Sequence, residues 1–316
     1  MDRLIGAPVA LVAGASRGLG LLVADELARR GHHVVIASRS EAALHDAATW
    51  LARETTSPER ISTVVMDVAD REAVRTVVQR VEDEIGPIDV AIHVAGIIEV
   101  GPAENTTHEH LNRAMNVMTW GPIHLSEIVI PHMRDRRRGR FGVVASVGGL
   151  VSAPHLLAYS TAKFAAVGYT EGLAASLSGS GVSATVITPG LMRTGSHTAA
   201  RFYGNRQREY AWFAPAASLP LLSMDAKRAA ARIVEGTLAG KPYVILTFVA
   251  KLGARVRGVA PSTTVRVMGL VNRVLPGGVN GADEPWPGSR LAPHVGRAVT
   301  GLIQFGERAR RRYLEP

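Results

Sequence analysis

Three polar residues carry the chemistry that this sequence suggests, namely Ser146, Tyr159 and Lys163. Tyr159 and Lys163 lie four positions apart on a predicted helix, so their side chains share one face. A free tyrosine has a pKa of about 10. An ammonium group one helical turn away favours the tyrosinate form and lowers that pKa. With the Ser146 hydroxyl beside it, such a tyrosine could donate or accept a proton at a substrate oxygen.

A second segment could hold a dinucleotide next to this group. The apolar run 8–13 predicts a buried parallel strand, and Gly14, Gly18 and Gly20 follow it directly. Residues 21–30 then predict a helix. This order suits a pyrophosphate, because glycines let the backbone approach it and the helix N-terminus offers free N–H groups.

The second predicted strand, residues 33–38, indicates which nicotinamide cofactor is preferred. A site for NAD usually has an acid after this strand to bind the ribose 2′-hydroxyl. Here the chain has Ser38 and Arg39, with no acid before Glu41. Arg39 and Arg17 could hold a 2′-phosphate, since a guanidinium matches phosphate geometry. We therefore expect NADP(H) in preference to NAD(H); solvated loop arginines are the alternative.

The order of these motifs resembles that of the short-chain dehydrogenase/reductase family. The resemblance covers about residues 8–250 and is to the plain single-domain subgroup, followed here by a C-terminal extension. One departure is His93-Val94, where the family usually has two asparagines. The motifs that carry the resemblance are Gly14-x-x-x-Gly18-x-Gly20, Asp67-Val68, Ala95-Gly96, Asn116, Ser146, Tyr159-x-x-x-Lys163, and Pro189-Gly190 with Thr194.

The resemblance implies an oxidoreductase that transfers a hydride between a nicotinamide and a carbonyl or secondary alcohol. Tyr159 would protonate the carbonyl oxygen, Ser146 would hydrogen-bond it, Lys163 would also hold the ribose, and Asn116 would carry a relay water. The implied catalytic residues are Asn116, Ser146, Tyr159 and Lys163. The implied cofactor contacts are Gly14, Ser16, Arg17, Gly18, Leu19, Gly20, Ser38, Arg39, Asp67, Val68, Ala95, Gly96, Tyr159, Lys163, Pro189, Gly190 and Thr194.

Apolar strands alternate with helical stretches along most of the chain. This pattern predicts an α/β fold with a doubly wound, Rossmann-like parallel sheet of about seven strands and a helical C-terminal extension. We expect a catalytic domain over residues 1–250 and a basic extension over 251–316. The predicted strands are 8–13, 33–38, 61–66, 89–94, 141–146, 182–188 and 242–248.

Residues 195–220 follow the motif that would flank the nicotinamide, so we expect them to cover the substrate. Aromatic side chains in this cover, and those between Ser146 and Tyr159, suggest a bulky apolar carbonyl or alcohol. Core packing explains single aromatic residues equally well. The expected substrate contacts are Ser146, His155, Tyr159, Phe202 and Trp212.

The composition excludes some classes of protein. The chain has no cysteine, which excludes disulfides and thiolate catalysis and fits a reducing compartment. The eleven histidines show no metal-ligand spacing, so we expect no metal. The apolar N-terminus predicts a strand rather than a signal peptide. The sequence has no stretch of about 18 apolar residues, so we expect no membrane-spanning helix. We expect a cytoplasmic protein, with the membrane surface as an alternative.

The positive charge is concentrated near the end of the chain. Residues 201–316 hold 18 basic and 7 acidic residues, a balance of +11, whereas residues 1–200 hold 18 and 20. Val265, Met268, Val271 and Leu275 recur at helical spacing after Pro261, which predicts a basic amphipathic helix. Such a helix could lie on a membrane, or pack on the body or on another subunit.

The partners expected are therefore a small-molecule substrate, no nucleic acid, peripheral membrane contact as an open alternative, and a second copy in a homo-oligomer. Two alternatives to a soluble carbonyl reductase remain. One is a membrane-associated dehydrogenase of a sterol- or lipid-type alcohol. The other is a non-catalytic dinucleotide sensor, against which the intact Ser146, Tyr159 and Lys163 argue, since a sensor needs no proton donor.

Overall fold

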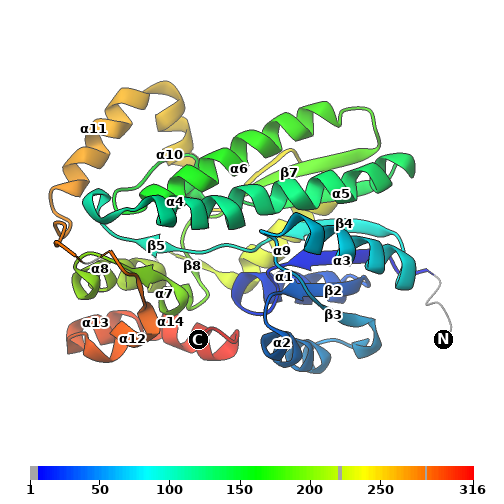
Figure 1. Ribbon diagram of the computed structural model, residues 1–316, viewed down its shortest axis with the longest axis horizontal. Helices are drawn as coiled ribbons and strands as arrows, with labels where there is room; N and C mark the ends of the chain where they lie inside the picture. Colours follow the sequence, from blue (N-terminus) through cyan, green and yellow to red (C-terminus); the bar gives the residue numbers. More distant parts are fainter. Residues whose placement is uncertain (1–5, 220–222, 282) are drawn as a thin grey trace.

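The computed structural model describes residues 6–219, 223–281 and 283–316, so residues 1–5, 220–222 and 282 of the predicted segments lie outside it. Its centre is a seven-stranded sheet in the order β11-β7-β6-β4-β1-β2-β3 (Figure 1). The paired strands of this sheet run parallel. The chain winds outward on both sides of β1 and β4, which confirms the predicted doubly wound, Rossmann-like sheet.

The strands lie close to their predicted positions. Residues 33–38 and 182–188 match at both ends. The predicted strand 242–248 is shorter than expected, because the Thr247 side chain accepts the amide N–H of Ala250 and begins the next helix. The strands are β1 Val9–Ala13, β2 His33–Ser38, β3 Ile61–Val65, β4 Ile88–His93, β6 Gly139–Val144, β7 Val182–Thr188 and β11 Tyr243–Ile245.

Helices cover both faces of the sheet, and alternation along the strands divides the core between them. In β1, Ala10 and Val12 point to one face, while Leu11 and Ala13 point to the other. The first face packs against α1 Gly18–Arg29, α2 Glu41–Glu54 and α9 Ala226–Leu238. The second packs against α3 Arg71–Glu84, α5 Gly121–Asp135 and α6 Leu157–Ser176.

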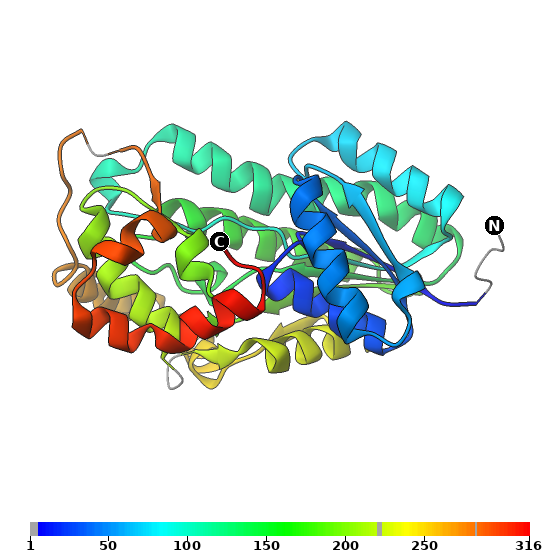
Figure 2. The ribbon, with the colours of Figure 1, turned by 90° about the horizontal axis from the view of Figure 1, so that it is seen from below.

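A second core lies beyond the carboxyl edge of the sheet and joins the predicted cover to the end of the chain (Figure 2). Phe202, Tyr210 and Phe213 pack there against Leu291 and Ile303. The elements around it are α4 His108–Met115, three two-residue strands β5 Glu99–Val100, β9 Arg201–Phe202 and β12 Trp286–Pro287, the pair β8 Met192–Arg193 and β10 Met224–Asp225, and the helices α7 Ser196–Ala199, α8 Arg206–Ser218, α12 Gly288–Leu291, α13 Arg297–Leu302 and α14 Gln304–Arg312.

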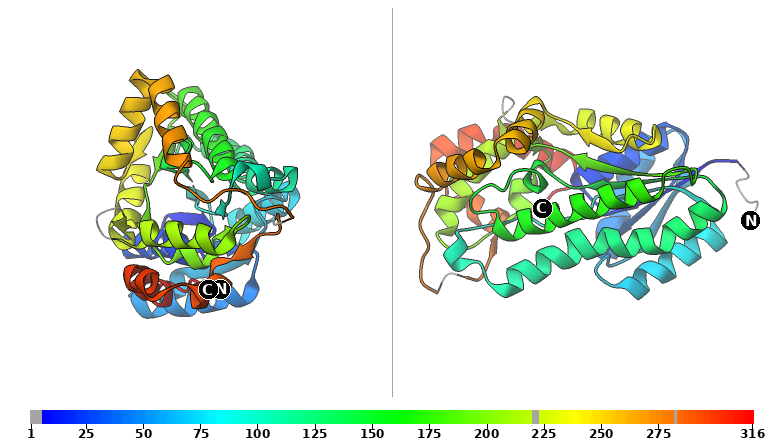
Figure 3. Two further views of the ribbon diagram at one scale, coloured as in Figure 1. Left: turned by 90° about the vertical axis from the view of Figure 1, so that its left-hand side faces the viewer. Right: turned by 90° about the horizontal axis from the view of Figure 1, so that it is seen from above.

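Two further helices, α10 Phe248–Val259 and α11 Pro261–Asn272, form a hairpin that stands beside α6 (Figures 1 and 3). The expected boundary at residue 250 falls inside α10, and the residues after 283 return to the cover. The division into two domains therefore stays a prediction. Within the described residues, no helix is long and apolar enough to cross a membrane.

Candidate functional site

The candidate site lies along the edge of the sheet where the parallel strands end. Ligands of open α/β sheets bind outside this edge, because the turns after several strands meet there. The residues predicted for cofactor binding fall into these turns. Gly14 to Gly20 follow β1, Ser38 and Arg39 end and follow β2, Asp67 and Val68 follow β3, Ala95 and Gly96 follow β4, and Pro189, Gly190 and Thr194 follow β7.

The turn of residues 14–20 is packed tightly against its neighbours. The Gly14 amide donates to the carbonyl oxygen of Ala37, at 2.8 Å. A Cβ on Gly14, whose φ is +87°, would lie 2.5 Å from the Cα of Ala95, and one on Gly20 would collide with the Gly14 carbonyl. Both positions therefore require glycine. A dinucleotide-binding fold needs glycines in this turn for the same reason, because its strand, turn and helix pack closely together.

The other predicted cofactor residues lie around this turn. Arg39 is exposed after β2, and the Asp67 carboxylate accepts the amide N–H of Ala69 at 3.0 Å. Thr194 is buried, and its hydroxyl accepts the amide N–H of Ser196 at 3.2 Å. The cofactor roles of these groups stay predictions.

Ser146, Tyr159 and Lys163 lie together at the same edge. The sequence predicts that Ser146 ends a strand, but the strand ends at Val144 and Ser146 begins a 3₁₀ turn. Its hydroxyl accepts the Gly148 amide N–H there, at 3.0 Å. The Tyr159 hydroxyl faces the same serine hydroxyl. The Lys163 ammonium nitrogen lies 5.8 Å from the centre of the Tyr159 ring and donates to the carbonyl oxygen of Val144 at 2.7 Å.

Two glycines after Ser146 allow this arrangement, and the sequence analysis did not single them out. A Cβ on Gly149 would lie 2.6 Å from the carbonyl oxygen of Lys163, and one on Gly148 would lie 3.0 Å from the Tyr159 ring. The loop can therefore press against α6 only with glycines here. The signal was available in the sequence, as a Gly-Gly pair directly downstream of the candidate serine.

The electrostatics differ from the prediction that Lys163 lowers the pKa of Tyr159. Burial raises the pKa of Tyr159, and the nearby Ser146 hydroxyl opposes this rise. Burial also lowers the pKa of Lys163 to about 7, so the lysine is a weaker source of positive charge than a solvated one. The site thus favours a protonated Tyr159, which is the form that donates a proton to a carbonyl oxygen.

Asn116 opens a π-helical turn, Asn116–Trp120, between α4 and α5, in which its carbonyl oxygen accepts the Gly121 amide N–H. The turn packs against the catalytic helix, because the Thr119 hydroxyl donates to the carbonyl oxygen of Ala162 at 3.0 Å. π-Helical turns are frequent at functional sites. The Asn116 side chain is exposed, however, and its role in a proton relay stays a prediction.

The predicted substrate contacts in the cover separate into two groups. Phe202 is fully buried and packs in the second core, and its contact with a substrate stays a prediction. His155 and Trp212 share a buried partner that the sequence analysis missed, Glu209. Its carboxylate accepts from the Trp212 indole at 2.8 Å and lies 2.9 Å from the His155 ring nitrogen Nδ1.

His93 occupies the position at which the family usually has asparagine. Its ring is buried, and burial together with the charge of Lys163 lowers its pKa to about 3. A Cβ on Gly121 would lie 2.7 Å from the ring nitrogen Nε2. The His93 ring, which is larger than an asparagine side chain, fits because Gly121 of α5 has no side chain. His93 remains neutral at physiological pH.

A further group meets the glycine turn from the far end of the chain, and nothing in the sequence pattern pointed to it. The Gly18 amide donates to the carbonyl oxygen of Tyr313 at 2.8 Å. The Glu315 carboxylate lies over Gly18, where a Cβ would collide with its Oε1, and its Oε2 lies 3.6 Å from Nε of Arg17. The turn therefore accommodates an anionic group beside the N-terminus of α1, which fits a cofactor phosphate.

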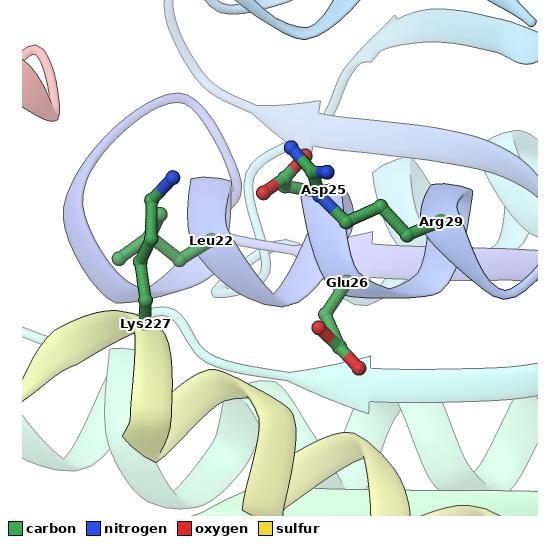
Figure 4. Close-up of a pocket in the computed structure, with 5 residues that line it drawn as sticks. All are labelled: Leu22, Asp25, Glu26, Arg29 and Lys227. Atoms are coloured by element: carbon green, nitrogen blue, oxygen red, sulfur yellow. The ribbon is translucent and has the colours of Figure 1, made fainter. Parts of the chain in front are cut away.

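A pocket between α1 and α9 lies outside this constellation (Figure 4). Leu22 and four charged side chains line it, and the Arg29 guanidinium pairs there with Asp25 at 3.0 Å. It contains none of the proton-transfer groups, so we assign no chemistry to it. Within the described residues, no group of three or more histidine or acidic side chains is placed to hold a metal ion.

Comparison with known proteins connects this geometry to a family. The family model described as short chain dehydrogenase matches residues 8–202. A 3-ketodihydrosphingosine reductase from Bacteroides thetaiotaomicron is 31% identical over 187 residues, which are 59% of this chain and 65% of the reductase, so the chain spans less than two thirds of that relative. A gluconate 5-dehydrogenase from Gluconobacter oxydans is 33% identical, over 58% of this chain and 71% of the dehydrogenase.

Solved structures agree. A short-chain dehydrogenase from Streptomyces avermitilis superposes with a TM-score of 0.70 at 27% sequence identity. The match covers 86% of this chain and 99% of that one. The shared fold therefore extends well beyond the segment that the family model matches.

The burial of Lys163 leads to a pH-dependent stability. Its pKa is about 7 in the folded protein and keeps its usual value of 10.5 in the unfolded chain, so the unfolded chain binds more protons above about pH 7. The free energy of unfolding should therefore increase as the pH rises from about 7 to about 9. This increase should be absent in Lys163→Met. Urea denaturation of both proteins across this range measures it; parallel pH curves would contradict it.

Proposed function

We propose that this chain, which belongs to the short-chain dehydrogenase family, is an NADP(H)-dependent oxidoreductase that reduces a carbonyl of a bulky apolar substrate, or oxidises the corresponding secondary alcohol. The observation that carries the proposal is the placement of the Tyr159 and Ser146 hydroxyls together, with the Lys163 ammonium nitrogen 5.8 Å from the tyrosine ring centre. These groups lie at the edge of the sheet that also carries the glycine turn. A non-catalytic sensor would have no use for this pair.

A bound nicotinamide would supply or accept the hydride. Gly14, Gly18 and Gly20 would hold its pyrophosphate, because they allow close approach beside the N-terminus of α1. In reduction, protonated Tyr159 donates its proton to the substrate oxygen, and Ser146 hydrogen-bonds the same oxygen. Lys163 remains behind the tyrosine, held by the carbonyl of Val144, where its charge stabilises the tyrosinate left after transfer.

The preference for NADP(H) is supported by Arg39, which is exposed after β2 with no acidic residue before Glu41. A guanidinium there would attract the 2′-phosphate, whereas an acid would repel it. The substrate class is supported by the buried pair of His155 and Glu209 beside Trp212 and by the apolar side chains in the same region. A ketone on dihydrosphingosine, which the name of one relative specifies, has this character. A cytoplasmic location and a homo-oligomer stay predictions.

We also propose that the hairpin α10–α11 docks on an anionic membrane. Apolar side chains that would pack inward on an ordinary surface helix are exposed here; they include Phe248 at 76%, Val259 at 89%, Val265 at 71% and Leu270 at 57% exposed. None of the residues that the structure describes in α11 is buried. The sequence pattern left packing on the body as an alternative, and this exposure argues against it.

Charge favours a membrane over a second copy of the chain. Between residues 248 and 282 there are five basic residues, Lys251, Arg255, Arg257, Arg266 and Arg273, and no acidic residue. Two copies meeting through this face would bring like charges together, which costs free energy. Anionic headgroups would attract the same arginines while the apolar side chains enter the interface.

The hairpin lies beside the site. The Arg257 guanidinium stacks over the Phe164 ring of α6 at 4.8 Å, and a Cβ on Gly253 would lie 3.6 Å from the Val151 side chain, which follows the Ser146 turn. A substrate that partitions into a bilayer would therefore arrive close to Tyr159. This favours the membrane-associated, lipid-type version of the reaction over a freely soluble substrate.

The catalytic assignment predicts that Tyr159→Phe lowers kcat by about 10²–10⁴ with any ketone that the wild type reduces. The affinity for NADPH should stay near that of the wild type, because only the phenol hydroxyl is removed. Tyr169→Phe is the control, since Tyr169 lies on the same helix and hydrogen-bonds Ser126 at 2.8 Å away from the site. Retention of most of the kcat by Tyr159→Phe would show that another group donates the proton.

The cofactor assignment predicts that Arg39→Asp lowers kcat/KM for NADPH and improves it for NADH relative to NADPH. The aspartate replaces attraction for a 2′-phosphate by repulsion and offers an acceptor to the ribose 2′-hydroxyl. Arg53→Asp, at the other end of α2, makes the same change in net charge and should leave the ratio unaltered. Equal use of both cofactors by the wild type would refute the preference.

The membrane proposal predicts co-sedimentation with vesicles of phosphatidylglycerol and phosphatidylcholine at low salt, and release at high salt. Vesicles of phosphatidylcholine alone should bind weakly. Arg266→Glu and Leu270→Asp should each weaken binding, whereas Arg134→Glu, in the last turn of α5, should not. If the wild type does not bind anionic vesicles at low salt, the proposal is refuted. If the wild type is a dimer that Leu270→Asp dissociates, the exposed face of the hairpin is an interface with a second copy.

A further inference from the structure

The segment Tyr313–Glu315 lies on the part of the site where the proposed cofactor would place its phosphates. Gly18 begins α1, and its amide N–H is one of the groups at a helix N-terminus that bind phosphate in dinucleotide folds. Here that N–H is bonded to the carbonyl oxygen of Tyr313. The Glu315 carboxylate fills the space over the Gly18 Cα, which a glycine leaves open for the approach of a ligand.

The contact is held from several sides. Tyr313 is buried in the core that α1 and α9 share, and Leu314 adopts a left-handed backbone with φ of +59°, which reverses the chain after α14. The Glu315 amide donates back to the carbonyl oxygen of Arg310 at 3.1 Å. These contacts fix the local conformation of the segment and direct it onto the glycine turn.

The charge of the segment matches that of the group it would replace. The Glu315 side chain is 8% exposed, and its Oε2 faces Arg17, one of the two arginines proposed for the 2′-phosphate. Burial raises the pKa of Glu315 to about 7, and the positive charge of Arg17 opposes that rise. Among the described residues, Oε2 has no hydrogen-bond partner. A buried carboxylate oxygen that accepts no hydrogen bond and has only a 3.6 Å ion pair with Arg17 is costly, so an anion with more partners could displace it.

We propose that the segment Tyr313–Glu315 is a built-in competitor of the dinucleotide. The Glu315 carboxylate and the Tyr313 carbonyl take the place of a cofactor phosphate on the glycine turn, and the segment must leave before the cofactor binds. The proposal rests on the function proposed above. It gives the enzyme two states, one closed by its own chain and one open to cofactor, and the apparent affinity falls with the fraction of molecules that are open.

The test is the dissociation constant of NADPH, measured by nucleotide fluorescence without any substrate. Glu315→Gln keeps the shape but removes the charge, Glu315→Ala removes the group, and deletion of residues 313–316 removes the contact. Each should bind NADPH more tightly than the wild type, the deletion by about tenfold or more if the closed state is populated about ten to one. Glu307→Gln, on α14 and paired with Arg310 at 2.9 Å, is the matched control and should bind like the wild type.

A second measurement follows the segment itself. Hydrogen exchange of the wild type should show residues 313–315 losing protection when NADPH is added, while residues 14–20 keep or gain it. Unchanged NADPH affinity in all three variants, weaker binding, or a segment that stays protected at saturating NADPH would each overturn the competitor while leaving the proposed function intact. If neither the wild type nor any variant binds NADPH or NADH, the proposed function falls, and the competitor falls with it.

Discussion

The hydrogen bond from the buried Lys163 ammonium to the Val144 carbonyl oxygen is the contact on which the site depends. An uncompensated ammonium in a protein interior costs several kcal/mol, so α6 is held where this bond can form. That position carries Tyr159 to the Ser146 turn. The loop of residues 147–149 crosses α6 closely, so Gly149 meets the helix backbone at Lys163 and Gly148 meets the Tyr159 ring.

Much of this arrangement could be predicted from the sequence, because it depends on local patterns. Residues 34–37 of β2 form an apolar run, and five of the seven residues of β7 are β-branched, which is typical of strands; the bounds of both were predicted correctly at both ends. The shared helix face of Tyr159 and Lys163 follows from their spacing alone. The pKa of Tyr159 could not be predicted in the same way, since its direction depends on how deeply tertiary packing buries both groups.

The cover was harder to predict, for physical reasons that its residues illustrate. The strands β9 and β12 are two residues long, too short for any periodicity, and they pair across more than eighty positions of the chain. An aromatic side chain such as Phe202 suits a core as well as a substrate pocket, and only the fold distinguishes them. Glu209 left a faint signal, since it is the one acid in an aromatic-rich helix, but its partners His155 and Trp212 become apparent only in the structure.

Helix α14 spans the distance between the cover and the glycine turn. Near the N-terminal end of α14, a Cβ on Gly306 would lie 2.7 Å from the His197 ring, so the cover and α14 pack closely together. At the other end the helix delivers Glu315 to Gly18. Two binding sites are thermodynamically linked when a ligand at one of them binds the open and closed states with different affinities, and the linkage is reciprocal. On the proposal above, a molecule under the cover that prefers one state would change the affinity of the glycine turn for nucleotide, and the nucleotide would change the affinity for that molecule by the same factor.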